Sequence, residues 1–248
     1  MRDSGYDVAP GNVTMVGRTA SGWLTIALIA ATLACGCDTS GDSATTTSPG
    51  AQPTPGSGTV EAVDRETMKV DEERAVRAVD TYWRRQFTER FGQPYQSPRV
   101  VGSYVGNNGP PCGGEPAVPF NAVYCHPGDY VAWDDELMNA GYSQIGDAWI
   151  YLIIAHEWGH AIQARLGSDQ VAVDAELQAD CLAGAALQGA AEDGLIGIEP
   201  GDTEEIARTL AAVADDYPWT DVGDHGNAEQ RTEAFNTGVS GGVDACIS

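Results

Sequence analysis

Two histidines inside one apolar segment constrain the fold of this chain more than any other feature. His156 and His160 lie four residues apart within residues 144–166, and the chain of 248 residues has only four histidines. The spacing of apolar residues predicts a helix here, and residues four apart share one face of a helix, so both imidazoles can point at one metal ion. Residues 148–155 are apolar on almost every side of this helix, which predicts a central, buried position.

Glu157 directly follows the first of these histidines. On the helix it lies beside them, placed to reach a water molecule on the metal ion and not the ion itself. The pattern H-E-x-x-H is typical of zinc metalloproteases, in which the glutamate acts as general base. The alternative is a coincidental or satisfied pair of core histidines. The glutamate between them and the buried setting favour one catalytic zinc ion.

A catalytic zinc ion has three protein ligands and keeps a fourth position for water, so a third ligand must be found. The metzincin class needs glycine and histidine at the positions that Gln163 and Leu166 occupy here, which excludes that class. Residues 171–191 predict a second long helix, which can return alongside the first after a turn that starts at Gly167. Glu176 on this second helix is therefore the candidate third ligand.

Asp180 lies one turn beyond Glu176 on the same helix face. It can accept the remaining ring N–H of a ligand histidine and so fix the tautomer of that ring. This is the His-His-Glu arrangement of gluzincin peptidases. Glu176 can instead be a solvated helix acid, and Asp174 is a competing carboxylate, although it lacks an aspartate one turn further on. Gly159 is either a weak point in its helix or a place where another backbone packs closely.

The other periodic segments complete a mainly helical pattern. The predicted elements are an amphipathic helix at residues 71–91, short strands at 99–104, 120–125 and 129–133, the two helices at 144–166 and 171–191, a helix at 202–215 and a short helix at 227–235. We therefore expect an α+β fold, a mainly helical zincin-like metallopeptidase domain with a small antiparallel sheet. Asp202 and Glu205 have capping-box spacing.

The N-terminal region has the pattern of an export signal. Residues 23–34 are apolar, a length too short for a bilayer span and suited to the core of a signal peptide. Cys35 and Cys37 follow, each after a small residue, as in a bacterial lipobox, although Leu33 is displaced by one position from that pattern. We expect residues 1–37 to be the signal peptide and lipobox region of an exported lipoprotein on the outer face of the membrane. Ordinary secretion and an uncleaved anchor are the alternatives.

Residues 38–61 are rich in serine, threonine, glycine and proline and predict a flexible tether, which leaves residues 62–248 for one metallopeptidase domain. The formal net charge is −23, and Lys69 is the single lysine. This composition offers no basic surface for nucleic acid and would repel anionic membranes. Any membrane contact is therefore expected only through an N-terminal lipid or anchor.

Four cysteines lie beyond the leader, and an even number in an exported chain suggests two disulfides with three possible pairings. We favour Cys112 with Cys125, which would close a short loop rich in proline and glycine. Cys181 would then pair with Cys246 and attach the C-terminus to the helix of the third ligand. Buried thiols are the alternative.

Three segments resemble a known family. Residues 156–163 (His-Glu-Trp-Gly-His-Ala-Ile-Gln), 176–184 (Glu-Leu-Gln-Ala-Asp-Cys-Leu-Ala-Gly) and 225–231 (His-Gly-Asn-Ala-Glu-Gln-Arg) are similar to motifs of the bacterial neutral zinc metallopeptidase family. That family itself resembles the gluzincins. The resemblance extends over about residues 98–248 and implies zinc at His156, His160 and Glu176, with Glu157 catalytic. Ala161 departs from it, because the family often has a further histidine there.

The expected reaction is hydrolysis of an amide bond in a peptide or protein substrate. Glu157 would take a proton from the attacking water and pass it to the leaving amine. His225 is the candidate donor to the developing oxyanion, with a structural histidine as the alternative, and Arg231 is a weaker candidate. Residues 130–133 can pair with an extended substrate as an added strand.

A second class of function is a non-catalytic zinc-binding scaffold of the cell envelope on a peptidase fold. The intact Glu157 argues against it, because a site that only binds zinc does not need a general base. An ion-binding module built on the acids of residues 215–224 is a third possibility, but their spacing fits no EF-hand loop.

Overall fold

The helix that carries both histidines, α3 (Ala148–Leu166), lies at the centre of the domain. It contacts α1 (Arg65–Phe91), α4 (Val173–Glu192) and α5 (Asp202–Ala212), and on its other side α2 (Asp135–Gln144) and the sheet. Almost every residue from its start to Gln163 is buried. The central position predicted from the apolar residues 148–155 is therefore confirmed.

The computed structural model describes residues 65–168, 173–215 and 225–247. The predicted signal peptide, Cys35, Cys37 and the tether all lie outside these ranges. Within them, none of the helices combines the length and the apolar character that a bilayer span needs.

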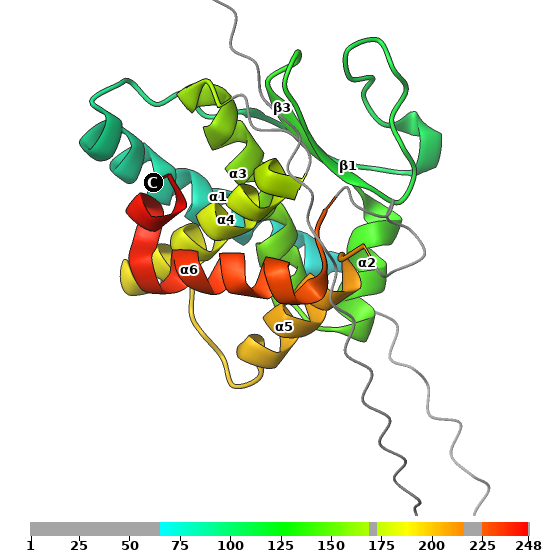
Figure 1. Ribbon diagram of the computed structural model, residues 1–248. Coiled ribbons are helices and arrows are strands. Elements are labelled where there is room, and N and C mark those ends of the chain that lie inside the picture. The colour runs from blue at the N-terminus through cyan, green and yellow to red at the C-terminus, as the bar shows by residue number, and fades with distance from the viewer. Residues whose placement is uncertain (1–64, 169–172, 216–224, 248) are drawn as a thin grey trace, which may run out of the picture. The chain divides into compact units, whose positions relative to one another are not determined.

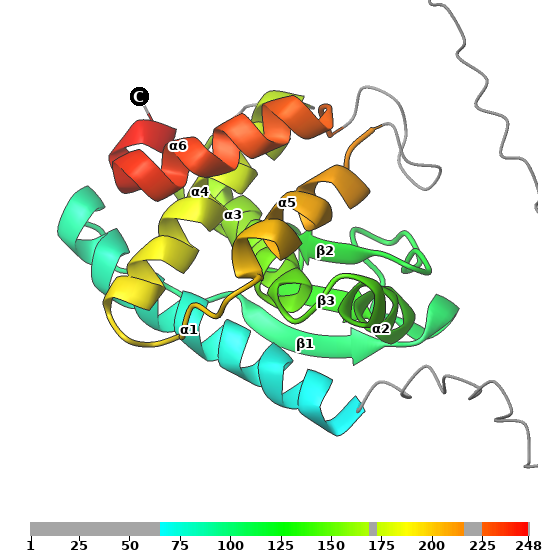
Figure 2. The same ribbon diagram turned by 90° about the horizontal axis from the view of Figure 1, so that it is seen from below.

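A three-stranded sheet and α2 lie on one side of α3, and α4 and α6 (Ala228–Cys246) lie on the other (Figures 1 and 2). The described elements are therefore mainly helical, and the predicted α+β class is confirmed. The sheet consists of β1 (Arg99–Tyr104), β2 (Ala122–Cys125) and β3 (Tyr130–Asp134), in the order β1-β3-β2.

The sheet is mixed, which corrects the prediction of an antiparallel one. β2 and β3 pair antiparallel across a short turn, but β1 pairs parallel with β3. The long connection after β1, which includes η1 (Gly106–Asn108), carries the chain to the far edge before β2 begins, so that β3 returns between them. Strand patterns do not reveal which strands become neighbours, so the sequence could not show this order.

The predicted helix at residues 144–166 is α3, which begins only at Ala148, and the separate helix α2 before it was not predicted. α2 begins after Asp134, whose carboxylate accepts a hydrogen bond from the Glu136 N–H at 2.8 Å. The break falls at Gly146, which has φ +139°, and a Cβ there would lie 2.0 Å from a carboxylate oxygen of Glu205. That carboxylate accepts a hydrogen bond from the Ala148 N–H at 3.2 Å. Glu205 therefore caps α3, and the capping box expected within its own helix is absent.

The last helix is longer than the predicted segment 227–235 and continues to Cys246. It packs closely on α4, because a Cβ on Gly238 would lie 1.8 Å from the Cys181 carbonyl oxygen. The structure pairs Cys181 with Cys246 and Cys112 with Cys125, as the sequence analysis favours. The first of these disulfides attaches the C-terminal end of α6 to α4.

Candidate metal centre

Three side chains from two helices direct electron-pair donor atoms at one point. The Nε2 atoms of His156 and His160 on α3 lie 3.1 Å apart. Glu176 on α4 places Oε2 3.2 Å from Nε2 of His156, and Oε1 3.4 Å from Nε2 of His160. Asp174, the competing carboxylate, is exposed and is not part of this group.

The approach of α4 to α3 brings Glu176 to the histidines. α3 ends at Gly167, which adopts the left-handed conformation that favours glycine, with φ 67°. Further back, Gly159 faces Ala179 of α4, and a Cβ on Gly159 would lie 2.7 Å from the Ala179 carbonyl oxygen. The close backbone packing considered for Gly159 is therefore present.

The donor set fits a zinc ion. Ligand atoms about 2.0–2.1 Å from zinc in tetrahedral geometry are roughly 3.3 Å from one another. Here the two Nε2 atoms lie 3.1 Å apart, and each has a different oxygen of the Glu176 carboxylate at 3.2 or 3.4 Å. Each Nδ1 faces an oxygen, Oδ1 of Asp180 for His156 and Oε1 of Gln163 for His160. If each Nδ1 donates its proton to that oxygen, each Nε2 carries a lone pair. The two lone pairs then face each other and the Glu176 carboxylate. Such a group of electron-pair donors is stabilised by a bound cation.

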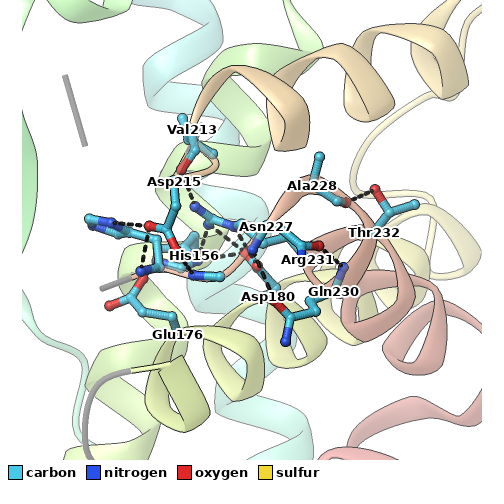
Figure 3. A network of polar contacts seen from close by, with 12 residues as sticks. His156, Glu176, Asp180, Val213, Asp215, Asn227, Ala228, Gln230, Arg231 and Thr232 are labelled. Atoms are coloured by element: carbon cyan, nitrogen blue, oxygen red, sulfur yellow. Dashed lines mark hydrogen bonds and ion pairs between the residues drawn. The ribbon is translucent and has the colours of Figure 1, made fainter. Parts of the chain in front are cut away.

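A buried ion pair supports His156 from behind (Figure 3). Its Nδ1 lies 2.8 Å from Oδ1 of Asp180, a fully buried side chain. Arg231 of α6 binds the same carboxylate through two nitrogens, at 2.8 and 2.9 Å, and donates to the Val213 carbonyl at 2.6 Å. Arg231 was a candidate for the oxyanion, but its guanidinium is engaged in holding Asp180. This position behind a candidate ligand was not predicted from the sequence.

These contacts shift the pKa values of three groups. Burial lowers the pKa of His156, but the Asp180 carboxylate, with a smaller contribution from Glu176, outweighs this and raises it to about 10. Burial raises the pKa of Asp180, and the Arg231 charge brings it below the ordinary value. Burial also raises the pKa of Glu176, but hydrogen bonds from His156 and His160 hold it well below its usual range. Both carboxylates are therefore anionic, as a cation site requires.

The donor atoms open onto a cleft of about 500 Å³. Glu157 lines it beside the histidines, and β2 with the residues before it lines the facing wall. His225 also reaches the cleft. The N–H groups of His225 and Gly226 donate to the two carboxylate oxygens of Asp215 at 2.9 and 2.8 Å. The His225 Nδ1 lies 3.5 Å from Asp215 Oδ1, an ion-pair distance that lacks hydrogen-bond geometry.

One predicted substrate contact is wrong. Residues 130–133 belong to β3, which lies between β1 and β2 and has both backbone edges paired. This segment therefore has no edge for an added strand. β2 is the edge strand of the described sheet that lines the cleft.

A mainly helical α+β domain with a His-His-Glu donor set is the arrangement expected of the class of zinc metallopeptidases. The chain matches the family described as "Putative neutral zinc metallopeptidase" over residues 2–248 and belongs to that family. Searches of curated proteins and of solved structures found no match.

Proposed function

We propose that the protein is a zinc-dependent peptidase with His156, His160 and Glu176 as the ligands of one zinc ion. The observation that carries this proposal is the convergence of their three donor atoms in a cleft that Glu157 also lines. Zinc, when bound, supplies a Lewis acid that polarises a carbonyl and lowers the pKa of water to about 7.

Glu157 is the proposed general base. It follows His156 on α3, and its side chain lies in the cleft wall without being a member of the donor group. It takes a proton from the attacking water and delivers it to the leaving amine, a role worth about 10²–10⁴ in rate.

His225 is the proposed donor to the developing oxyanion. The Asp215 carboxylate accepts hydrogen bonds from the backbone N–H groups of His225 and Gly226 and so fixes the backbone that carries the imidazole. Nδ1 of His225 faces the same carboxylate. An imidazole that carries its proton on Nε2 can donate from that atom to the oxyanion while Nδ1 faces Asp215. One such donor contributes roughly 10²–10³ in rate.

The outer edge of β2 can hold an extended peptide. In an antiparallel pair, successive residues turn their backbone groups alternately toward and away from the partner strand. The Asp134 N–H donates to the Asn121 carbonyl at 2.8 Å, so the next residue, Ala122, and then Tyr124 direct theirs away from β3. Both residues line the cleft. A substrate strand would therefore hydrogen-bond to Ala122 and Tyr124.

The test is cleavage of a mixed peptide library by the zinc-loaded full chain beside its Glu157→Ala variant. We expect cuts by the wild type, at least a ~10²-fold loss in the variant, and equal zinc content in both. Normal turnover by the variant would overturn the mechanism. Stoichiometric zinc without cleavage by either protein would instead favour the envelope scaffold.

We also propose that the protein is an exported lipoprotein. Two disulfides support export, because such bonds persist in oxidising compartments. Metabolic labelling with palmitate in a bacterial host tests lipidation. Label that survives both Cys35→Ser and Cys37→Ser together would contradict it.

A further inference from the structure

We infer that Gln163 and Gln178 are positioning residues, which fix the His160 ring and connect it to the C-terminal end of α6. The inference rests on the proposed zinc site and deepens it. Neither glutamine belongs to the donor group, yet both lie in the motifs around it: Gln163 three residues after His160, and Gln178 two residues before Asp180.

Backbone carbonyls fix the orientation of both amides. Gln178 lies with one amide atom 2.9 Å from the Cys246 carbonyl oxygen, and Gln163 lies with one 2.7 Å from that of Ala175. A carbonyl oxygen only accepts, so both of these amide atoms must be nitrogen. The remaining Gln178 atom is then oxygen, and it accepts a second hydrogen bond from the Gln163 nitrogen at 3.1 Å.

This orientation determines the tautomer of His160. With the Gln163 nitrogen committed to two acceptors, its oxygen must face Nδ1 of His160, at 2.9 Å. Nδ1 must therefore carry the proton, which leaves the Nε2 lone pair for the metal ion. Gln163 is buried, with 7% of its surface exposed, so water does not readily replace this contact.

The relay reaches the end of the described chain. Cys246, whose carbonyl holds Gln178, is joined to Cys181 by the disulfide between α6 and α4. The ordered contacts run from His160 through Gln163 and Gln178 to Cys246. The two candidate histidine ligands are thus supported differently, His156 by an ion pair and His160 by two neutral amides.

Three variants of the full chain test the relay. Gln178→Met keeps an unbranched side chain of similar length but removes the acceptor for Gln163, and we expect zinc affinity to fall about tenfold, the lower end for outer-layer contacts. Gln178→Glu retains an acceptor for Gln163 but loses the N–H that donates to the Cys246 carbonyl, so we expect its zinc affinity to lie between those of wild type and Gln178→Met. Gln188→Met on the same helix is the matched control, because Gln188 contacts Glu192 and lies outside the relay. Zinc affinity is measured by competition with a chelator.

The ¹⁵N NMR signals of the neutral His160 ring in the metal-free protein give a second readout. We expect the proton on Nδ1 in wild type and Gln178→Glu, and a detectable minor share of the Nε2–H tautomer in Gln178→Met, because only the Ala175 carbonyl then holds the Gln163 amide in place. Equal zinc affinity in Gln178→Met and wild type, or equal losses in Gln178→Met and Gln178→Glu, would overturn the relay. If wild type binds no zinc, the proposed function fails, while the tautomer still decides whether the relay exists.

Discussion

Arg231 and Asp180 form a two-point ion pair between α6 and α4. The Nε and Nη2 atoms of Arg231 lie 2.8 and 2.9 Å from the two oxygens of the Asp180 carboxylate. Only 2% of Arg231 and none of Asp180 is exposed. One carboxylate oxygen also faces Nδ1 of His156 at 2.8 Å, so two helices together hold a ring that belongs to a third.

Arg231→Met is expected to destabilise the fold and weaken zinc binding. The substitution leaves the Asp180 charge buried without its partner, which costs about 3–5 kcal/mol of unfolding free energy. It also releases the support of His156, so zinc affinity should fall by about 10–100-fold. Urea unfolding and chelator competition measure the two effects.

Two comparisons separate these effects. Arg77→Met removes an exposed arginine paired with Glu73 and should change stability little. Combining Arg231→Met with Asp180→Leu removes both buried charges, so stability should recover while zinc binding stays weak. A loss in Arg231→Met no larger than in Arg77→Met would show that the buried pair contributes nothing to the fold.

Gly159→Ala is expected to separate the two helices that carry the candidate ligands. Its Cβ would lie 2.7 and 2.9 Å from backbone atoms of Ala179, which cannot move without shifting α4. We expect a loss of about 1–3 kcal/mol in unfolding free energy, together with weaker zinc binding. Gly197→Ala, where a Cβ meets nothing within 4 Å, is the control. Zinc affinity equal to that of the control would mean that this contact does not position Glu176.

The sequence predicted the parts of the site that depend on local spacing. His156, His160 and Glu157 share one helical segment, and Glu176 and Asp180 lie one turn apart on the next, so helical geometry alone groups them. The apolar residues 148–155 likewise predicted a central helix.

Contacts between distant segments were not predictable in this way. Arg231 reaches Asp180 from α6, and Glu205 caps α3 from α5, because of how the helices pack. α2 was missed because Asp134 is both the last residue of β3 and the N-cap of α2. The alternating pattern of a strand therefore changes to the pattern of a helix with no loop residues between them to mark the boundary. The last helix was predicted to end at Phe235, whereas α6 continues through Gly238, which allows its close packing on α4.

Glu176→Ala is expected to weaken zinc binding far more than Asp174→Ala. Both acids lie in the first turn of α4, but only Glu176 places its oxygens 3.2 and 3.4 Å from the two Nε2 atoms. Loss of a ligand should exceed the roughly 100-fold upper range for outer-layer contacts, and Asp174→Ala should stay near wild type. Zinc titration of both variants decides the assignment, and the reverse order would move the third ligand to Asp174.

Zinc binding is expected to release a proton from His156 near neutral pH. Burial lowers the pKa of this ring, but Asp180 and, to a smaller extent, Glu176 raise it from 6.5 to about 10, so below that pH the metal-free ring holds a proton that zinc must displace. Zinc affinity should therefore rise with pH through this range by up to about tenfold per unit, whereas an ordinary histidine would level off above its own pKa. Asp180→Asn removes the anion and should lower the pKa, so at pH 8 the wild type should release more protons than this variant. Calorimetry in two buffers of different ionisation enthalpy measures the difference, and equal proton release would show that Asp180 does not hold the proton on His156.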